Sequence, residues 1–255
     1  MDFTTLNSKE LSDKLNVILA KYRREQNDKE RANHVSSGKV NPSGLGQPIQ
    51  WQVLRILGVP QKQVDDYTLG VFRRGKSAED DIIEEFEGIG IIKSKQTKID
   101  WNGMFGYIDT VMDLSCIGLK ELPIEIKSVK NAKWARIVKS GKPDESNALQ
   151  ASTYALATKE SVGVVLYVSA EDYRVMLFFV NPSDYLERIK ETVQTIQNCI
   201  KNGFVPRFEA RESWQALTQY NNYPEWSQLS EEEIIAKLKK EYPKAYSKLK
   251  GEKDE

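Results

Sequence analysis

The chain has 255 residues, 40% of them hydrophobic, and its 37 basic and 37 acidic side chains give a formal net charge of zero. This length fits one large domain or a domain with appendages. The sequence has no apolar run of about 18 residues, so we expect no membrane-spanning helix. The single histidine, His34, excludes zinc sites of the His-Glu-x-x-His type and paired-histidine phosphoesterase centres, and we expect it to be a solvated surface residue.

The first half of the chain changes from helical to strand periodicity near residue 90. Leu11, Leu15 and Ile18 recur at helical spacing and predict an amphipathic first helix. Helices are expected over residues 8–32, 49–57 and 67–86, with Gly58 and Gly88 as the ends of the second and third. Strands are expected over residues 90–101, 107–114 and 122–129.

The second half predicts a further helix, two strands and two more helices. Residues 131–144 are polar and basic and predict no regular structure, and residues 206–228 are aromatic and irregular. Helices are expected over residues 145–158 and 183–202, strands over 162–168 and 175–180, and a frayed tail over 248–255. Ser230 and Glu233 form a capping-box pattern that predicts the start of the last helix.

This order of elements predicts an α/β fold, a mixed sheet of about five strands flanked by helices. We expect one domain over residues 1–255. Its parts are a helical N-terminal part, a sheet core, and a C-terminal aromatic segment with a helix, over residues 1–66, 67–205 and 206–255.

Three charged side chains on adjacent predicted strands indicate a site for phosphodiester hydrolysis. Glu125 and Lys127 are two residues apart and share one face of their strand, and Asp109 can meet Glu125 if the strands pair. Two partly buried carboxylates repel each other unless a cation lies between them, and oxygen ligands suit Mg²⁺. Lys127 would position or deprotonate the attacking water or stabilise developing charge, and the Ile126 carbonyl is an additional candidate ligand. The alternative interpretation is an exposed strand face with an ordinary Glu-Lys pair.

The segments Gly106-Tyr107-Ile108-Asp109, Glu125-Ile126-Lys127-Ser128 and Gln150-Ala151-Ser152-Thr153-Tyr154 together resemble the PD-(D/E)XK nuclease superfamily, in particular its RecB-nuclease and Cas4-like branch. The likeness spans roughly residues 42–206 and implies a restriction-endonuclease-like core. It also implies a DNA nuclease dependent on Mg²⁺ or Mn²⁺.

Further site residues follow from this resemblance. Gly75-Lys76-Ser77-Ala78-Glu79 matches the Gly-x3-Glu form of an early helix motif, which makes Glu79 a candidate metal ligand and Asp80 the alternative. Gln150 and Tyr154 share a helix face. The resemblance implies that the glutamine contacts the site or the DNA backbone and that the tyrosine supports it. The alternatives are a solvated acidic run for Glu79 and a core position for Tyr154.

The chain departs from Cas4-like proteins in its cysteines. Pro48 stands where the first cluster-binding cysteine would lie, the aromatic segment holds none, and Cys116 and Cys199 cannot hold a cluster. We therefore expect no iron–sulfur cluster and propose that aromatic packing by Trp214, Tyr220, Tyr223 and Trp226 pins the C-terminus to the early helices. The chain has only two cysteines, and its N-terminus lacks signal-peptide features. We therefore expect a cytoplasmic protein, encoded by a cell or by a phage or virus.

A basic stretch after the Glu-x-Lys strand predicts contacts with DNA. Its cations are suited to phosphates, and Trp134 could stack on an unpaired base. The predicted DNA-binding residues are Lys130, Lys133, Trp134, Arg136, Lys139 and Lys142. Arg73 and Arg74 are weaker candidates, and a solvated surface loop is the alternative.

The sequence therefore predicts a metal-dependent deoxyribonuclease, acting as an exonuclease on DNA ends or single strands in recombination, repair, or phage- or CRISPR-related processing. A restriction-type endonuclease and a degenerate member that binds DNA or protein without cutting stay open. Polarity, strand preference, RNA tolerance, partners and a possible homo-oligomer are not determined by these residues.

Overall fold

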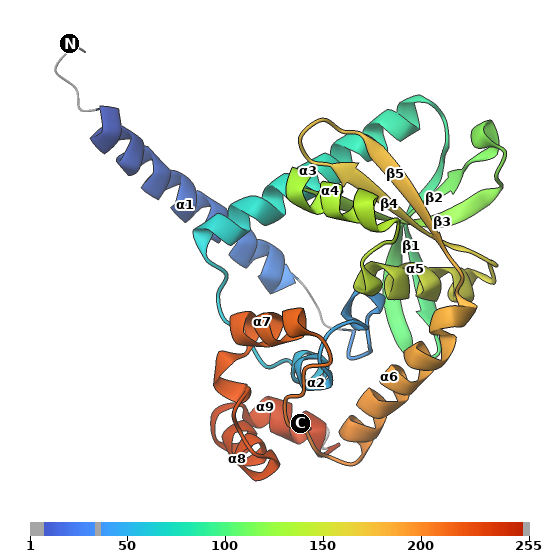
Figure 1. Cartoon of the computed structure of the whole chain (residues 1–255). Helices are drawn as coiled ribbons and strands as arrows, with labels where there is room; N and C mark the ends of the chain where they lie inside the picture. The colour runs from blue at the N-terminus through green and yellow to red at the C-terminus, as the bar shows by residue number, and fades with distance from the viewer. Residues whose placement is uncertain (1–7, 34–36, 252–255) are drawn as a thin grey trace.

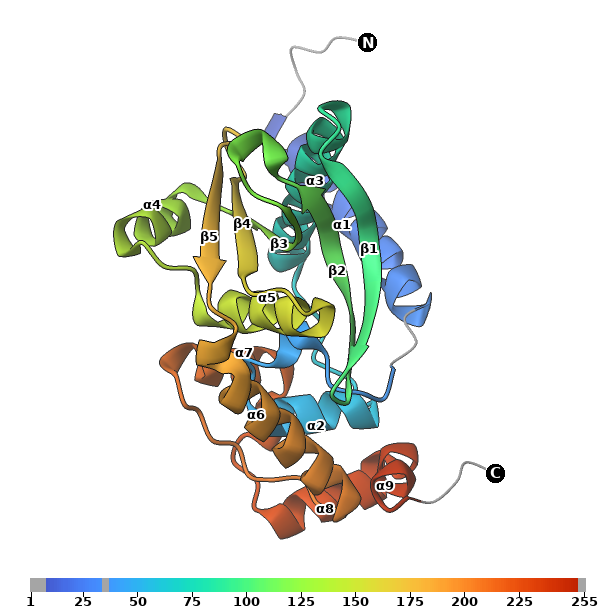
Figure 2. The same cartoon turned by 90° about the vertical axis from the view of Figure 1, so that its right-hand side faces the viewer.

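The computed structural model describes residues 8–33 and 37–251. Five strands form a single sheet whose spatial order is the order of the chain (Figure 2). They are β1 (Ile92–Trp101), β2 (Met104–Asp113), β3 (Glu121–Val129), β4 (Gly163–Ser169) and β5 (Val175–Val180). Only β3 and β4 are parallel, so the sheet is mixed. The predicted α/β fold class is confirmed.

The parallel pair requires a crossover connection, since two parallel strands cannot be joined by a hairpin. The connection contains α4 (Asn131–Ser140) and α5 (Glu145–Thr158). Alternate residues of the inner strands serve opposite faces, as strand geometry dictates. Ile124 and Ile126 pack with Ile82 of α3 (Asp66–Gly88), whereas Val165 and Tyr167 pack with Ala148 and Ala151 of α5. Helices α3 and α5 therefore cover opposite faces of β3.

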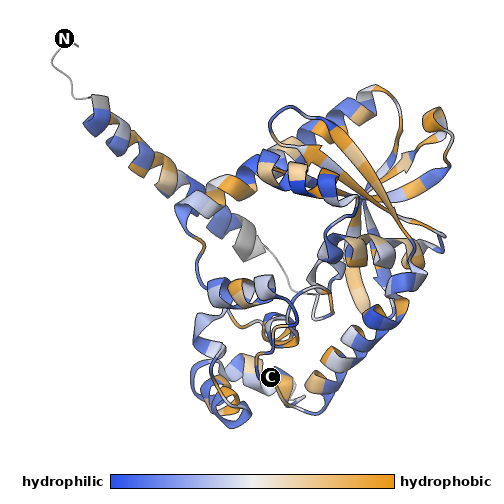
Figure 3. Cartoon of the chain, viewed as in Figure 1, coloured by the Kyte–Doolittle hydropathy of each residue, from blue (hydrophilic) through white to orange (hydrophobic). Residues whose placement is uncertain are grey.

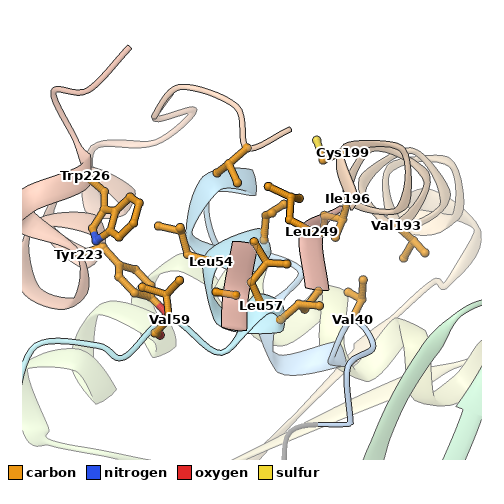
Figure 4. Packing of buried hydrophobic residues seen from close by; sticks show 14 of the residues in the cluster. Val40, Leu54, Leu57, Val59, Val193, Ile196, Cys199, Tyr223, Trp226 and Leu249 are labelled. Carbon is orange, nitrogen blue, oxygen red and sulfur yellow. The ribbon is translucent and has the colours of Figure 1, made fainter. Parts of the chain in front are cut away.

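A second layer of helices lies beyond α5 (Figure 1). It contains α2 (Ile49–Leu57), α6 (Ser183–Lys201), α7 (Ser213–Asn222), α8 (Glu231–Glu241) and α9 (Pro243–Leu249). Figure 4 shows their shared core, in which Leu54 and Leu57 of α2 meet Ile196 of α6 and Leu249 of α9. Short 3-10 turns at Pro42–Gly44, Ser115–Ile117 and Pro224–Trp226 complete the fold.

The aromatic segment pins the C-terminal region to the early helices through two of its four predicted residues. Tyr223 and Trp226 are buried in the core shared with α2, and the Trp51 and Tyr223 rings lie edge to face at 6.4 Å. Tyr220 is 62% exposed and Trp214 is 38% exposed, so these two rings contribute little burial.

Three segments are more regular than predicted. Residues 131–140 form α4 because Trp134 and Ile137, three apart, both face the core beneath β4, and Gly141 closes the helix at a φ of 63°. Residues 213–222 form α7, which begins with a capping box at Glu212. The frayed tail is wrong for residues 248–251, since Leu249 is 1% exposed and Lys248 Nζ donates to the Ile56 carbonyl at 2.6 Å.

Three elements have the predicted boundaries, and the other predicted helices and strands of the first two thirds of the chain are present with ends that differ by up to three residues. Helices α2 and α5 and strand β5 match their expected spans, Gly58 ends α2 in the left-handed region at a φ of 84°, and both hydrogen bonds of the Ser230–Glu233 capping box are present. His34 lies outside the described residues. No described helix is long and apolar enough to cross a membrane.

Helix α1 (Ser8–Asn33) projects from the body of the protein and crosses α3 near its own C-terminal half (Figure 1). Its apolar residues alternate with polar ones along the projecting part (Figure 3). Leu15 and Ile18 are 57% and 64% exposed. The predicted helix is therefore present, but its apolar stripe does not enter the core.

Candidate active site

The predicted acidic residues lie where β2 and β3 separate. The ladder between these strands ends at the pair Thr110–Ile124; beyond it β2 stays with β1, and β3 stays with β4. Asp109 and Glu125 occupy the next position on each strand and border the resulting fork. The Ile126 N–H, which lies past the last β2–β3 pair, donates instead to Asp109 Oδ2 at 2.9 Å. One carboxylate thus bridges the strands where their ladder has stopped.

Glu125 and Lys127 form an ion pair inside the fork. The Glu125 side chain is fully buried, and that of Lys127 is 33% exposed, so the ammonium lies nearer to solvent. Lys127 Nζ also donates to the Ile126 carbonyl at 3.2 Å. By strict hydrogen-bond geometry neither carboxylate oxygen of Glu125 accepts a hydrogen bond within the described chain, although Lys127 pairs with one of them and the Tyr154 hydroxyl lies near the carboxylate. The same-face placement predicted by the two-residue spacing is confirmed, and so is the inward position of the Ile126 side chain, which is 1% exposed.

The electrostatics of the fork favour an added positive charge. Burial raises the pKa of Glu125 to about 8, and the repulsion of Asp109 adds to the effect, while Lys127 opposes it. Burial alone would lower the pKa of Lys127. The attraction of Glu125 and Asp109 outweighs that effect and raises the pKa above its ordinary value, so the ammonium is charged at neutral pH. A buried carboxylate with unfilled acceptor capacity is costly unless a cation or further donors satisfy it.

Helix α3 brings a third carboxylate to the fork. Glu79 Oε1 accepts a hydrogen bond from the Ser128 N–H at 3.2 Å, and a Cβ on Gly75 would approach Ser128 Oγ to 3.0 Å. The glycine therefore allows α3 to lie close against β3. Burial raises the pKa of Glu79, whereas Lys127 lowers it. Asp80, the alternative candidate, is exposed, and its Oδ2 lies 3.7 Å from Lys76 Nζ on the helix surface. Of the two acidic residues, the structure therefore brings Glu79 to the fork.

Gln150 and Tyr154 connect α5 to the fork through one hydroxyl group. Tyr154 OH accepts from Gln150 Nε2 at 2.7 Å and donates to the Tyr107 carbonyl at 2.8 Å. Burial raises the pKa of Tyr154, and the nearby Glu125 carboxylate raises it further. Tyr107 lies two residues before Asp109 on β2, so the hydroxyl anchors the strand that carries this carboxylate. No sequence signal marked Tyr107, because it acts through its backbone.

The donors in the fork fit a hard divalent cation. Among the described residues, no three histidine, cysteine, aspartate or glutamate side chains are already grouped closely enough to hold a metal ion. Mg²⁺ does not require such a cage, since it commonly uses one or two carboxylates, several waters and substrate phosphates. The carboxylates of Glu125 and Asp109 and the carbonyl of Ile126 are oxygen donors of this kind.

The basic stretch after β3 differs from its prediction. It is helix α4 instead of a loop, and Trp134 is only 9% exposed because its ring packs into the core, with the Arg174 guanidinium 5.5 Å from its centroid. Stacking of Trp134 on an unpaired base is therefore wrong for this conformation. The residue spacing of Trp134 and Ile137 was the signal that could have indicated an inward ring.

Two of the predicted DNA-binding cations are already paired. Lys133 Nζ lies 2.6 Å and Arg136 Nη2 2.7 Å from the two carboxylate oxygens of Asp144. Lys130 lies over the Tyr67 ring at 5.5 Å. Lys139 and Lys142 are exposed. Asp144 thus reduces the positive charge that the sequence predicted here.

Comparison with known proteins gives structural neighbours only. No protein-family model matches the chain, and no curated protein matches it significantly in sequence. The crystal structure of an alkaline exonuclease (LHK-Exo) from Laribacter hongkongensis is similar over 66% of this chain and 90% of that chain, with 16% identity and a TM-score of 0.49. The structure of LHK-Exo in complex with dAMP is similar over 65% of this chain and 91% of that chain, with 13% identity and a TM-score of 0.47. The crystal structure of SSO0001 is similar over 71% of this chain and 86% of that chain, with 15% identity and a TM-score of 0.43.

Proposed function

We propose that this chain is a DNA nuclease that hydrolyses phosphodiester bonds with Mg²⁺ or Mn²⁺. The observation that carries the proposal is the fork between β2 and β3. There a fully buried glutamate pairs with a protonated lysine beside a second carboxylate, and its acceptor capacity is not filled by the described chain. An isolated structural ion pair would not need Asp109 and Glu79 at the same place.

Each residue of the fork has a distinct part in this proposal. Asp109 and Glu125 would hold the metal with the Ile126 carbonyl, and Glu79 would be a further ligand or accept a hydrogen bond from a water beside it. A bound divalent cation would neutralise charge on the scissile phosphate and make a bound water acidic. Lys127 donates hydrogen bonds to the attacking water and to the phosphate oxygen on which charge accumulates. Its raised pKa supports this donor role over that of a base.

The α5 residues orient these groups. Tyr154 holds β2 through the Tyr107 carbonyl, so it is a positioning residue. Gln150 holds the Tyr154 hydroxyl with one amide hydrogen, and we propose that its other amide hydrogen contacts a DNA phosphate near the fork. Exonuclease action on ends or single strands, in recombination, repair or phage- or CRISPR-related processing, follows from the resemblance to the RecB-nuclease and Cas4-like branch.

The first test is a cleavage assay on end-labelled single-stranded, linear duplex and closed circular DNA, with Mg²⁺, Mn²⁺ or EDTA. Glu125→Gln and Lys127→Met are the site variants. Lys120 and Glu160 form an ion pair of the same composition but exposed at the opposite end of β3, so Lys120→Met is the matched control. We expect metal-dependent loss of linear DNA that falls at least about 100-fold in both site variants and persists in the control.

The outcomes separate the open alternatives. Cleavage of linear but not circular DNA supports an exonuclease, whereas discrete cuts in circular DNA support a restriction-type endonuclease. Absence of cleavage under every metal condition, with DNA binding retained, would replace the proposal with a binding role for a degenerate site.

A further inference from the structure

A groove runs between α1 and α3, on the flank of α3 beside the fork. It is lined by Tyr22 and Arg23 from α1 and by Phe72, Arg73 and Lys76 from α3. A second hollow continues it past Arg73 and Arg74 to Ala170 and Tyr173 near the β4–β5 turn. The ion pair between Arg24 and Asp66, at 2.7 Å, fixes the two helices at this crossing.

Each wall of the groove carries an aromatic ring that is open to solvent. Tyr22 of α1 is 49% exposed and Phe72 of α3 is 60% exposed. The two rings provide flat apolar faces for a ligand. Exposed aromatic rings in a basic groove are the platform on which unpaired bases stack.

Each wall also carries an arginine next to its ring, Arg23 on α1 and Arg73 on α3. Arg23 and Arg73 line both hollows, and neither forms a hydrogen bond or ion pair within the described chain. Arg74 donates to the Ala170 carbonyl at 2.8 Å and keeps its charge. No carboxylate lines the second hollow. Uncompensated guanidinium groups at one place are suited to phosphate oxygens, which they bind in bidentate geometry.

The acidic residues of the groove are already engaged. Asp80 lies 3.7 Å from Lys76, and Asp81 accepts a hydrogen bond from the Tyr173 hydroxyl at 2.7 Å. Both carboxylates keep their negative charge, but Arg23, Arg73, Arg74 and Lys76 outnumber them, so the two hollows together carry an excess of positive charge that suits a polyanion.

We propose that the α1–α3 groove binds single-stranded DNA and leads one strand to the fork. The bases stack on Tyr22 and Phe72, and the phosphates contact Arg23 and Arg73. The proposal deepens the proposed nuclease function and rests on it for the identity of the substrate. A groove of this kind selects a single strand, because the faces of bases inside a duplex are already stacked on their neighbours.

The position of the groove connects it to the site. Phe72, Lys76 and Glu79 are spaced by four and three residues and so lie along one stripe of α3. At a helical rise of about 1.5 Å per residue, Phe72 lies roughly 10 Å along the helix axis from Glu79. A strand that stacks on Phe72 therefore reaches the fork within a few nucleotides.

The test is a binding titration of the full chain with fluorescent oligo(dT) and with a duplex of equal length, in EDTA so that hydrolysis does not intervene. Tyr22→Ala, Phe72→Ala and Arg73→Gln are the groove variants. Tyr220, which is 62% exposed with Lys62 over its ring at 5.9 Å, is a matched aromatic–cation pair elsewhere, so Tyr220→Ala and Lys62→Gln are the controls.

We expect wild type to bind oligo(dT) more tightly than duplex. Each lost ring should weaken oligo(dT) binding about 5- to 150-fold, since stacking contributes about 1–3 kcal/mol per base. Arg73→Gln should lower the slope of log K against log salt by about 0.7, the value for one phosphate contact on a single strand. Both controls should bind like wild type.

Unchanged oligo(dT) binding in the three groove variants would overturn the proposal, as would tighter binding of duplex. A second copy of the chain covering the rings would also overturn it; Phe72→Ala would then convert a dimer to a monomer in light scattering without weakening oligo(dT). Groove-dependent binding without any metal-dependent cleavage would keep the groove and refute the nuclease. Metal-dependent cleavage by wild type, together with normal oligo(dT) binding by the groove variants, would keep the nuclease and refute the groove.

Discussion

Removal of the Tyr154 hydroxyl should separate positioning from stability. The ring is 2% exposed, and its hydroxyl has one donor and one acceptor partner, Gln150 Nε2 and the Tyr107 carbonyl. Tyr154→Phe keeps the packing of the ring but leaves both partners without their bond in a buried place. For neutral groups we take the lower part of the range for an unsatisfied buried group, about 1–2 kcal/mol each, so we expect a loss of about 2–4 kcal/mol in the free energy of unfolding.

The stability effect can be measured by thermal and urea denaturation. For a chain of this size, each kcal/mol corresponds to about 2–4 °C in Tm, so a decrease of roughly 5–15 °C is expected. Tyr223→Phe is the control, because Tyr223 is 1% exposed in the helical core and donates to the Val59 carbonyl at 3.1 Å, away from the fork. It should also lower Tm.

Cleavage should distinguish the two variants. The Tyr154 hydroxyl holds β2 two residues before Asp109, and a displacement of about 1 Å at a catalytic centre can lower rate by about 100-fold. We expect Tyr154→Phe to reduce metal-dependent kcat at least about 10-fold at a temperature where both variants are folded, and Tyr223→Phe to leave it near the wild-type value. Equal kcat in the two variants would refute a positioning role for Tyr154.

Two further predictions concern charge and packing. The pKa of Glu125 is raised from 4.5 to about 8 in the folded chain, so the contribution of this group to stability is largest below about pH 4.5 and is lost as the pH rises toward 8. In EDTA, the Tm of wild type should therefore decrease from pH 5 to pH 8 more than the Tm of Glu125→Gln. A parallel decrease in both proteins would contradict the raised pKa. A Cβ on Gly163 would lie 2.8 Å from the backbone of Ala151, so Gly163→Ala should force α5 away from β4 and lower the free energy of unfolding by more than about 1 kcal/mol in urea denaturation. Gly118→Ala is the control: its Cβ meets no atom within 4 Å, but the φ of 82° strains the backbone, so it tests strain without a clash. Equal losses in both variants would contradict this reasoning.

Local chemistry in the sequence was sufficient to predict most elements. Some strands alternate with the two-residue period of a strand, and the continuously apolar ones are short and rich in β-branched residues. Gly58 and the Ser230–Glu233 pair mark helix ends by backbone conformation and hydrogen bonding alone. The shared face of Glu125 and Lys127 follows from the pleat, independent of the rest of the fold. These features depend on residues within a few positions of one another.

Tertiary structure decided what the charges and rings of the chain contact. Whether Asp109 meets Glu125 depends on the β2–β3 register and on where that ladder ends. Whether Lys133 and Arg136 are free for phosphate depends on how the chain folds back after α4, since the turn that follows this helix brings Asp144 to both side chains. Trp134 is inward and Tyr22 and Phe72 are outward, although all three are aromatic residues beside cations. Composition cannot distinguish them, because burial is a property of the elements that pack around a side chain, and those elements come from distant parts of the sequence.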